Sequence, residues 1–239
     1  MNIDFSDRII LVAGGTGGLG RAVSLAFLQE GAKVRVTYRK EDEYNTLKSA
    51  AGKHEARLSG SIVDVTDEAA TAALVEKIIS EHGKIDALVN TVGGYAGGTK
   101  LWKMDTKIFD AMLSLNLRSG YSLARAVLPA MLEQRHGVIV NIAAKAAMDH
   151  GAGAGAYAAS KAAAVALMDS LAGDTQGTQV RVNSILPSII DTDANRQAMP
   201  NANFAAWPKP EDIARVILFL CSDEAKVIHG AAIPVYGNG

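Results

Sequence analysis

Short apolar runs alternate with longer helix-like stretches along the whole chain. The runs are rich in Val, Ile and Leu, and most lack the polar alternation of a half-exposed strand. Continuous runs of this kind are typical of strands buried on both faces, as in a parallel sheet. The pattern predicts seven strands, at residues 8–13, 33–38, 61–65, 87–90, 138–143, 180–186 and 232–235.

The stretches between these runs are amphipathic and helical in pattern, most clearly at 67–82, 107–133 and 211–221. Alternation of strand and helix predicts right-handed βαβ units. Neither an internal repeat nor a Pro/Gly/Ser-rich linker divides the chain. We therefore expect an α/β protein that is one doubly wound Rossmann domain over residues 1–239. Its mostly seven-stranded parallel sheet should carry helices on both faces.

Composition and charge exclude some partners. The 239 residues are 49% hydrophobic and 21% charged, with a formal net charge of −1, which does not favour nucleic acid or an anionic membrane surface. Cys221 is the single cysteine and lies in an apolar run, so a packed thiol is expected. The first residues lack a signal-peptide pattern, and no apolar run reaches the ~20 residues that span a membrane. A cytoplasmic protein is expected.

A glycine-rich loop joins the first strand to a helical pattern. The loop is Gly14-Gly15-Thr16-Gly17-Gly18-Leu19-Gly20. Glycines permit a tight turn and close backbone approach, and a helix N-terminus offers free N–H groups to a phosphate. A plain tight turn is the alternative, but the order of strand, loop, helix and second strand favours dinucleotide binding.

The residues after the second strand bear on the choice of dinucleotide. An acidic residue there would bind the ribose 2′-hydroxyl of NAD, whereas this chain has Tyr38-Arg39-Lys40. Arg39 can stack on adenine or grip a 2′-phosphate, which predicts that NADP(H) is favoured over NAD(H). Glu41 and Asp42 keep open the alternative that Arg39 is only a solvated charge.

Tyr157 and Lys161 form the candidate chemical centre. They are four residues apart in an alanine-rich stretch that favours helix, so both side chains should share one face. A neighbouring ammonium lowers the pKa of a phenol, which makes Tyr157 a candidate general acid. A surface pair is the alternative, and the upstream glycine loop favours the catalytic interpretation.

Taken together, these motifs resemble the short-chain dehydrogenase/reductase family over essentially the whole chain. The Tyr157 and Lys161 pair matches the family's Tyr-x-x-x-Lys motif, and Asn116 matches the asparagine that holds a proton-relay water. The resemblance implies that Tyr157, Lys161 and Asn116 are catalytic. It implies a cofactor site made by Gly14, Gly15, Thr16, Gly17, Gly18, Leu19, Gly20, Tyr38, Arg39, Asp64, Val65, Asn90, Thr91, Val92, Gly93, Tyr157, Lys161, Pro187, Ile190 and Thr192.

One position departs from the family pattern. The family carries a serine thirteen residues before the tyrosine, where it bonds the substrate oxygen, and this chain has Ala144. Loss of one such donor typically costs ~10²–10³ in rate when charge builds up on oxygen. A conjugated or quinonoid acceptor spreads that charge, and the dihydropteridine reductase branch also lacks the serine. Local stretches around the substrate end resemble that branch, including residues 93–98 and 144–149.

The substrate side has further candidates, each with a plain structural alternative. Tyr95 can stack on a flat ring or cover the core, and Trp207 can line a lid or anchor its own segment. Lys145, next to Ala144, can replace the missing serine or be an exposed lysine. A substrate-covering segment is expected near residues 193–208.

Three functions follow from this pattern. The leading expectation is NADPH-dependent reduction of a flat conjugated substrate, such as a dihydropteridine, with Tyr157 as the acid. The second is an ordinary carbonyl or ketone reductase, and the third is a cofactor-binding protein with little catalysis. No catalytic metal is expected, because the five histidines lack ligand spacing. The family resemblance implies a homodimer or homotetramer acting on a small molecule.

Overall fold

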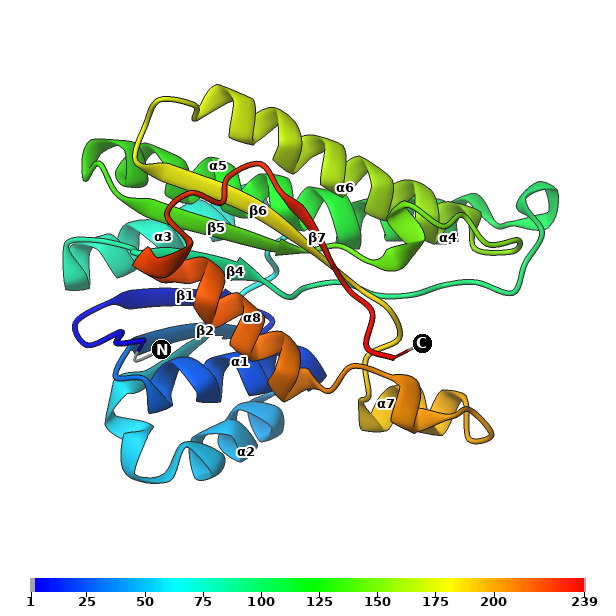
Figure 1. The fold of residues 1–239 in the computed structure, drawn as a ribbon, viewed down its shortest axis with the longest axis horizontal. Helices are drawn as coiled ribbons and strands as arrows, with labels where there is room; N and C mark the ends of the chain where they lie inside the picture. Colours follow the sequence, from blue (N-terminus) through cyan, green and yellow to red (C-terminus); the bar gives the residue numbers. More distant parts are fainter. Residues whose placement is uncertain (1–2, 239) are drawn as a thin grey trace.

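The structure is a computed structural model that describes residues 3–238. One seven-stranded sheet runs through the molecule in the order β3-β2-β1-β4-β5-β6-β7, and every neighbouring pair is parallel (Figure 1). The expected Rossmann architecture is therefore confirmed. The strands are β1 Ile9–Ala13, β2 Lys33–Tyr38, β3 Leu58–Ile62, β4 Ala87–Asn90, β5 Gly137–Ile142, β6 Val180–Pro187 and β7 Ala232–Val235.

Strand β3 is the exception to an otherwise close match with the sequence pattern. It begins and ends three residues earlier than the predicted 61–65. β3 is an edge strand that pairs only with β2, and small or polar residues fill its centre. The strand therefore has a weak apolar pattern. The more apolar residues that follow it shifted the predicted strand toward the C-terminus. Asp64 consequently lies in the loop after the strand, at the carboxyl edge of the sheet.

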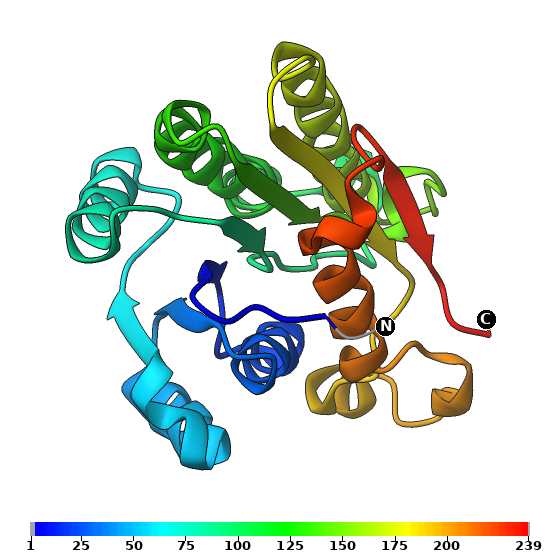
Figure 2. The same cartoon turned by 60° about the vertical axis from the view of Figure 1, so that its left-hand side comes forward.

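Helices cover both faces of the sheet. Figure 2 shows α1, α2 and α8 on one face, with α3, α5 and α6 on the other. The α-helices are α1 Gly18–Gln29, α2 Glu41–Ala51, α3 Glu68–His82, α4 Thr106–Leu113, α5 Ser119–Glu133, α6 Gly155–Asp174, α7 Asp193–Ala198 and α8 Pro210–Cys221, and the short helical turns are Gly52–Arg57, Leu101–Lys103, Lys145–Ala147, Phe204–Ala206 and Asp223–Ala225. Over residues 3–238, none of these helices has the length and apolar character that crossing a bilayer requires.

The predicted helix 107–133 is interrupted. A π-helical turn, Ser114–Arg118, joins α4 to α5 and contains Asn116. Such turns occur mostly as single insertions in α-helices and often mark functional sites. The sequence pattern missed the turn because one extra residue changes an apolar period only slightly.

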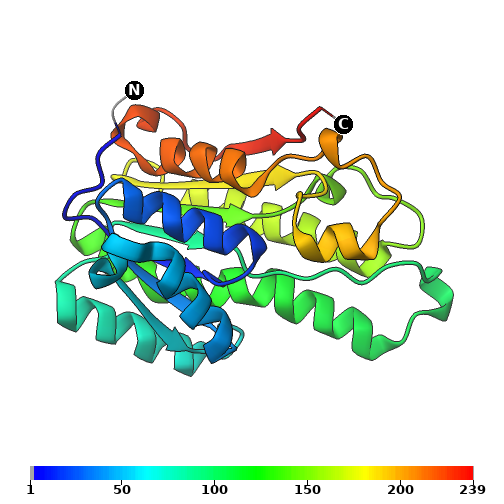
Figure 3. The same ribbon diagram turned by 90° about the horizontal axis from the view of Figure 1, so that it is seen from below.

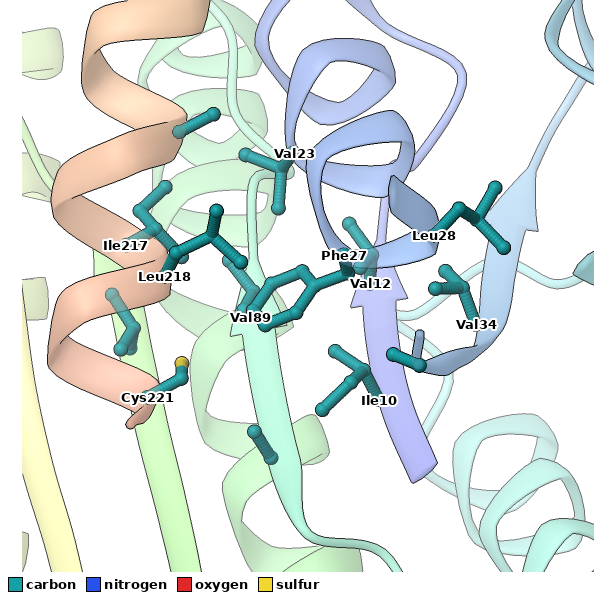
Figure 4. Close-up of a cluster of buried hydrophobic side chains, with 14 of the residues drawn as sticks. Ile10, Val12, Val23, Phe27, Leu28, Val34, Val89, Ile217, Leu218 and Cys221 are labelled. Atoms are coloured by element: carbon teal, nitrogen blue, oxygen red, sulfur yellow. The ribbon is translucent and has the colours of Figure 1, made fainter. Parts of the chain in front are cut away.

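A buried cluster fixes the helices of one face against the sheet. Phe27 of α1 packs between Ile10 of β1 and Val89 of β4, with Ile217 of α8 beside it (Figure 4). Burial of one such side chain contributes about 1.5–3 kcal/mol. Cys221 belongs to the same cluster, and burial raises the pKa of its thiol to about 12. The residue is a packed thiol in an apolar setting, as its sequence context predicts.

The segment 193–208 folds as α7 followed by the turn Phe204–Ala206. It extends from the sheet's carboxyl edge beside the end of the chain (Figure 3). Two backbone hydrogen bonds tie it down: Asp191 N donates to Pro208 O at 3.0 Å, and Asn238 N donates to Ala206 O at 3.2 Å.

Candidate active site

The strand order creates a crevice at the carboxyl edge of the sheet. β1 pairs with β2 on one side and with β4 on the other, so the chain reverses direction across the sheet at this point. Ligands of open α/β sheets bind at such switch points. One cleft here is lined by Gly14, Thr16, Gly17, Thr37, Tyr38, Arg39, Glu43, Val63, Asp64, Val65, Thr66, Thr91, Val92, Gly93 and Leu115.

The glycine loop is packed too tightly for side chains. A Cβ on Gly20 would lie 2.1 Å from the carbonyl oxygen of Gly14, and one on Gly15 would lie 2.5 Å from Val36. Gly14 has a φ of +72°, which favours glycine. Thr37 holds the loop from β2, because its Oγ1 accepts from Gly14 N at 2.9 Å. The loop therefore presents backbone and the start of α1, as a phosphate requires.

The stretch 187–192 closes over the same loop. A Cβ on Gly18 would lie 2.7 Å from Cγ2 of Thr192, so these two predicted cofactor residues are in contact. Thr192 Oγ1 accepts from Asn195 N at 3.3 Å and caps α7, while Ile190 O accepts from Asn195 Nδ2 at 2.8 Å. Pro187 ends β6. The nucleotide end of the cleft and the covering segment are therefore one connected structure.

The loops after β2 and β3 face each other across the cleft. Hydrogen bonds from Thr66, and to a lesser degree the Arg39 guanidinium, hold the pKa of Asp64 below its usual value. Arg39 is exposed, while Tyr38 is buried and its hydroxyl donates to Glu41 at 2.8 Å. Sequence reasoning missed Glu43, which also lines the cleft. The sequence offered one indication of this residue, because Glu43 is an acid in the first turn of the helix that follows Arg39.

Lys161 and Asn116 meet at the backbone of Gly93. A Cβ on Gly93 would lie 2.9 Å from Asn116 Oδ1 and 3.0 Å from Lys161 Nζ. Lys161 is buried and its Nζ donates to Ile142 O at 2.8 Å. Tyr157 precedes Lys161 by one turn of α6. Lys161 and Asn116 thus flank Gly93, which lines the cleft, and Tyr157 lies one helical turn away.

The ionisation of the pair differs from the sequence expectation. Burial, and then the Tyr95 phenol, raise the pKa of Tyr157 to about 12, while burial lowers the pKa of Lys161 to about 8. The tyrosine pKa is thus raised and not lowered, because burial of the phenol is the largest effect on it. Tyr157 is therefore a protonated phenol at neutral pH, which is the state that an acid needs.

Asn116 organises the backbone around the site. Its Oδ1 accepts from Gly94 N at 3.0 Å, and its Nδ2 donates to Gly94 O at 3.1 Å and to Ser160 Oγ at 3.0 Å. Ser160 in turn donates to the carbonyl of Tyr157 at 2.8 Å. Asn116 thus connects the loop after β4 to the helix that carries the tyrosine.

Asn90 and Thr91 hold the start of the loop after β4. Asn90 Oδ1 accepts from Val92 N at 3.1 Å, and its Nδ2 donates to Asn141 Oδ1 at 2.9 Å. Thr91 Oγ1 donates to the carbonyl of Ala13 at 2.7 Å. These two residues position the loop against β1 and β5, so their observed contacts are structural.

The four predicted substrate residues have different surroundings. The Tyr95 ring meets Tyr157 edge-on, with centroids 5.0 Å apart. Ala144 is buried just after β5 and brings no hydroxyl. Lys145 places its ammonium 5.1 Å from the ring centroid of Tyr236. Trp207 packs on Phe204 at 5.0 Å, as an anchor within its own segment would.

The residues present suit a nicotinamide dinucleotide. The glycine cradle and the start of α1 match a pyrophosphate, and the cleft continues from Arg39 past Gly93. Leu19, the remaining residue of the predicted loop, is buried in α1 and supports the loop through packing. Among residues 3–238, no cluster of three or more His, Cys, Asp or Glu side chains is arranged to hold a metal ion.

Comparison with known proteins defines the family. The model for short chain dehydrogenase matches residues 8–203. 3-Oxoacyl-[acyl-carrier-protein] reductase FabG of Thermotoga maritima is 31% identical over 239 residues, covering 97% of each chain. 7alpha-Hydroxysteroid dehydrogenase of Escherichia coli K12 is 31% identical over 247 residues, covering 100% of this chain and 96% of the relative. The chain belongs to the short-chain dehydrogenase/reductase family.

A solved structure supports the same assignment. A short-chain type dehydrogenase/reductase from Mycobacterium ulcerans superposes with a TM-score of 0.92 at 27% identity, over 98% of this chain and 90% of that one. The two named relatives are a ketoacyl reductase and a hydroxysteroid dehydrogenase. They do not support the dihydropteridine reductase branch that the local stretches suggested. The protein is an oxidoreductase of this family with an NAD(P) cofactor.

Proposed function

We propose that the protein is an NADPH-dependent carbonyl reductase with Tyr157 as its general acid. One observation carries this proposal: Lys161 and Asn116 flank Gly93, which lines one cleft together with the glycine loop, and Tyr157 lies one helical turn from Lys161. The names of the relatives, a 3-oxoacyl reductase and a hydroxysteroid dehydrogenase, support a carbonyl or alcohol as substrate.

Each residue of the site has a distinct task in this proposal. A bound nicotinamide supplies the hydride. Tyr157 Oη donates its proton to the substrate oxygen as that oxygen gains charge. Lys161, fixed by the carbonyl of Ile142, holds positive potential near the phenol. Asn116 fixes the backbone at Gly94 and, through Ser160, the turn of α6 that carries Tyr157.

Arg39 supports the preference for NADP(H). Its exposed guanidinium lines the cleft after β2, where it can pair with a 2′-phosphate. We expect NADPH to bind more tightly than NADH, and Arg39→Asp to reverse this order, in fluorescence titrations with both nucleotides. Equal affinities in the unmodified protein would contradict the assignment.

Ala144 favours a second candidate substrate class. With no hydroxyl at this position, the site lacks the donor that would stabilise a localised oxyanion. A flat conjugated or quinonoid acceptor, such as a dihydropteridine, needs that donor less. The Tyr95 ring beside Tyr157 offers such a molecule an aromatic surface.

One assay separates these functions. NADPH oxidation is measured with a panel of ketones, including a 3-oxoacyl thioester and a ketosteroid, and with quinonoid dihydropterin. Turnover of ketones alone supports carbonyl reduction, and turnover of the pterin alone supports the conjugated acceptor. Tight NADPH binding without any turnover would support a cofactor-binding protein and overturn both enzymatic proposals.

We also propose an oligomeric state and a cellular location for the protein. A homodimer or homotetramer, paired through α4–α5 and α6, follows from the family assignment and is tested by sedimentation. Cytoplasmic location is expected from the sequence composition and is tested by fractionation of cells that produce the protein.

A further inference from the structure

Glu43 lies where the second helix meets the glycine loop. α2 begins at Glu41, and its first turn carries three acids, Glu41, Asp42 and Glu43. Acids at this place commonly complement the positive end of a helix dipole. Glu43 does more, because its Oε2 accepts a hydrogen bond from Thr16 Oγ1 in the glycine loop at 3.2 Å.

Of these three acids, Glu43 is the one that lines the dinucleotide cleft. The Glu41 carboxylate accepts from the Tyr38 hydroxyl at 2.8 Å, and Asp42 is exposed outside the cleft lining. Glu43 shares the lining with Arg39, so an anionic and a cationic side chain border the same cleft.

The charge of Glu43 is only partly compensated. Its Oε1 lies 3.1 Å from Lys40 Nζ, but the two side chains are 41% and 69% exposed. Exposed pairs of this kind contribute little, and solvent screens them. Solvent therefore competes for this pair, and the second carboxylate oxygen, Oε2, faces Thr16 of the glycine loop.

We propose that Glu43 sets the ratio of NADP(H) to NAD(H) affinity. A 2′-phosphate carries up to two negative charges, so the Glu43 carboxylate opposes the group that Arg39 attracts. The 2′-hydroxyl of NAD(H) is neutral and can donate a hydrogen bond to the same carboxylate. This role rests on the proposed use of the cleft by a nicotinamide dinucleotide, and it makes Glu43 a specificity residue that counteracts Arg39.

The test compares Glu43→Gln with Asp42→Asn. Both remove one negative charge from the same helical turn, and glutamine keeps an acceptor for Thr16 Oγ1. Dissociation constants for NADPH and NADH are measured with each variant and the unmodified protein at two salt concentrations. Removing a negative charge from the cleft lining that Glu43 shares with Arg39 is expected to tighten NADPH binding about three- to tenfold.

The expected result is a larger NADPH gain in Glu43→Gln than in Asp42→Asn, with NADH unchanged or weaker, and a gain that shrinks as salt rises. Equal shifts in the two variants, or equal shifts for both nucleotides, would overturn the role of Glu43. In those cases the proposed reductase function stands. If the unmodified protein binds neither nucleotide, the proposed function and the role of Glu43 fail together.

Discussion

A single missing hydroxyl distinguishes this active site from the pattern of its family. Ala144 is buried two residues after the end of β5. Tyr157 therefore remains as the proposed donor to a reacting oxygen, without the neighbouring serine. Its raised pKa keeps the Tyr157 phenol protonated at neutral pH, so the residue can donate a proton. Negative charge on the reacting substrate oxygen, however, is stabilised by one hydrogen-bond donor fewer.

Ala144→Ser tests how much the missing hydrogen-bond donor matters. For a ketone substrate, we expect turnover to rise by up to about 10²-fold, because one oxyanion donor contributes on this scale. For a quinonoid substrate, turnover should stay within about twofold, because little charge gathers on one atom. Ala143→Ser is the matched control, since it adds the same hydroxyl one residue earlier among apolar neighbours. A large gain on the quinonoid substrate would contradict this account.

Residues whose position follows from backbone spacing were predictable from sequence. Residues that reach the cleft through the direction of their side chains were not. The glycines and the Tyr157–Lys161 pair were found because a loop and one helical turn fix their spacing. Thr37 and Glu43 reach the same cleft only because particular side chains turn toward the glycine loop. Residue type and position along the chain do not encode that direction.

At the scale of elements, the π-helical turn between α4 and α5 gives Asn116 its position. The turn belongs to a continuous helical path from Thr106 to Glu133, which the sequence predicted as one helix. Through the turn, the Asn116 side chain reaches both the loop after β4 and α6. Asn116 thus connects the turn to both of these elements.

Asn116→Ala should destabilise the fold as well as impair catalysis. The change removes the Asn116 partner from the partly buried peptide groups of Gly94 and from the buried Ser160 hydroxyl. We expect a loss of about 2–4 kcal/mol in the free energy of unfolding, measured in urea. Ser122→Ala is the control, because its buried hydroxyl has no hydrogen-bond partner among the described residues. Similar losses in the two variants would refute the connecting role of Asn116.

Strand β3 shows where sequence patterns fail for an element. The other strands carry a larger share of apolar residues than β3, and their predicted bounds lie within one residue of the observed ones. β3 is an edge strand with Ser59, Gly60 and Ser61 at its centre, and its position is set by pairing with β2. Tertiary contacts, not local composition, determine such a strand.

At the scale of the whole molecule, a charged network lies at the amino ends of the strands, opposite the candidate active site. Asp86 is buried, accepts from Ile9 N at 2.7 Å and pairs with Arg8 at 3.2 Å. The same Arg8 nitrogen lies 2.8 Å from Nε2 of His136. Burial, followed by the Arg8 charge, lowers the pKa of His136 below its usual value. The contact with Arg8 and the lowered pKa both favour the neutral imidazole.

This network should make the stability depend on pH. A lowered folded-state pKa means that the unfolded chain binds the proton more readily. The contribution of His136 is therefore complete above the unfolded pKa of about 6.5 and is lost as pH falls toward the folded value. Urea unfolding between pH 7.5 and 5 should show a smaller decline for His136→Gln than for the unmodified protein. His150→Gln, in an exposed loop, is the control, and an unchanged decline in His136→Gln would exclude this histidine as the source.

Burial of Cys221 has a practical consequence for spectroscopy. The chain has no second cysteine, and this thiol is covered by the apolar cluster under α8. A raised pKa further suppresses the thiolate that maleimide dyes attack. A cysteine introduced at the exposed Ile189, just before the covering segment, would be the preferred labelling position in the folded protein. A fluorophore at this position could thus report a movement of the covering segment over the cleft, without background labelling of Cys221.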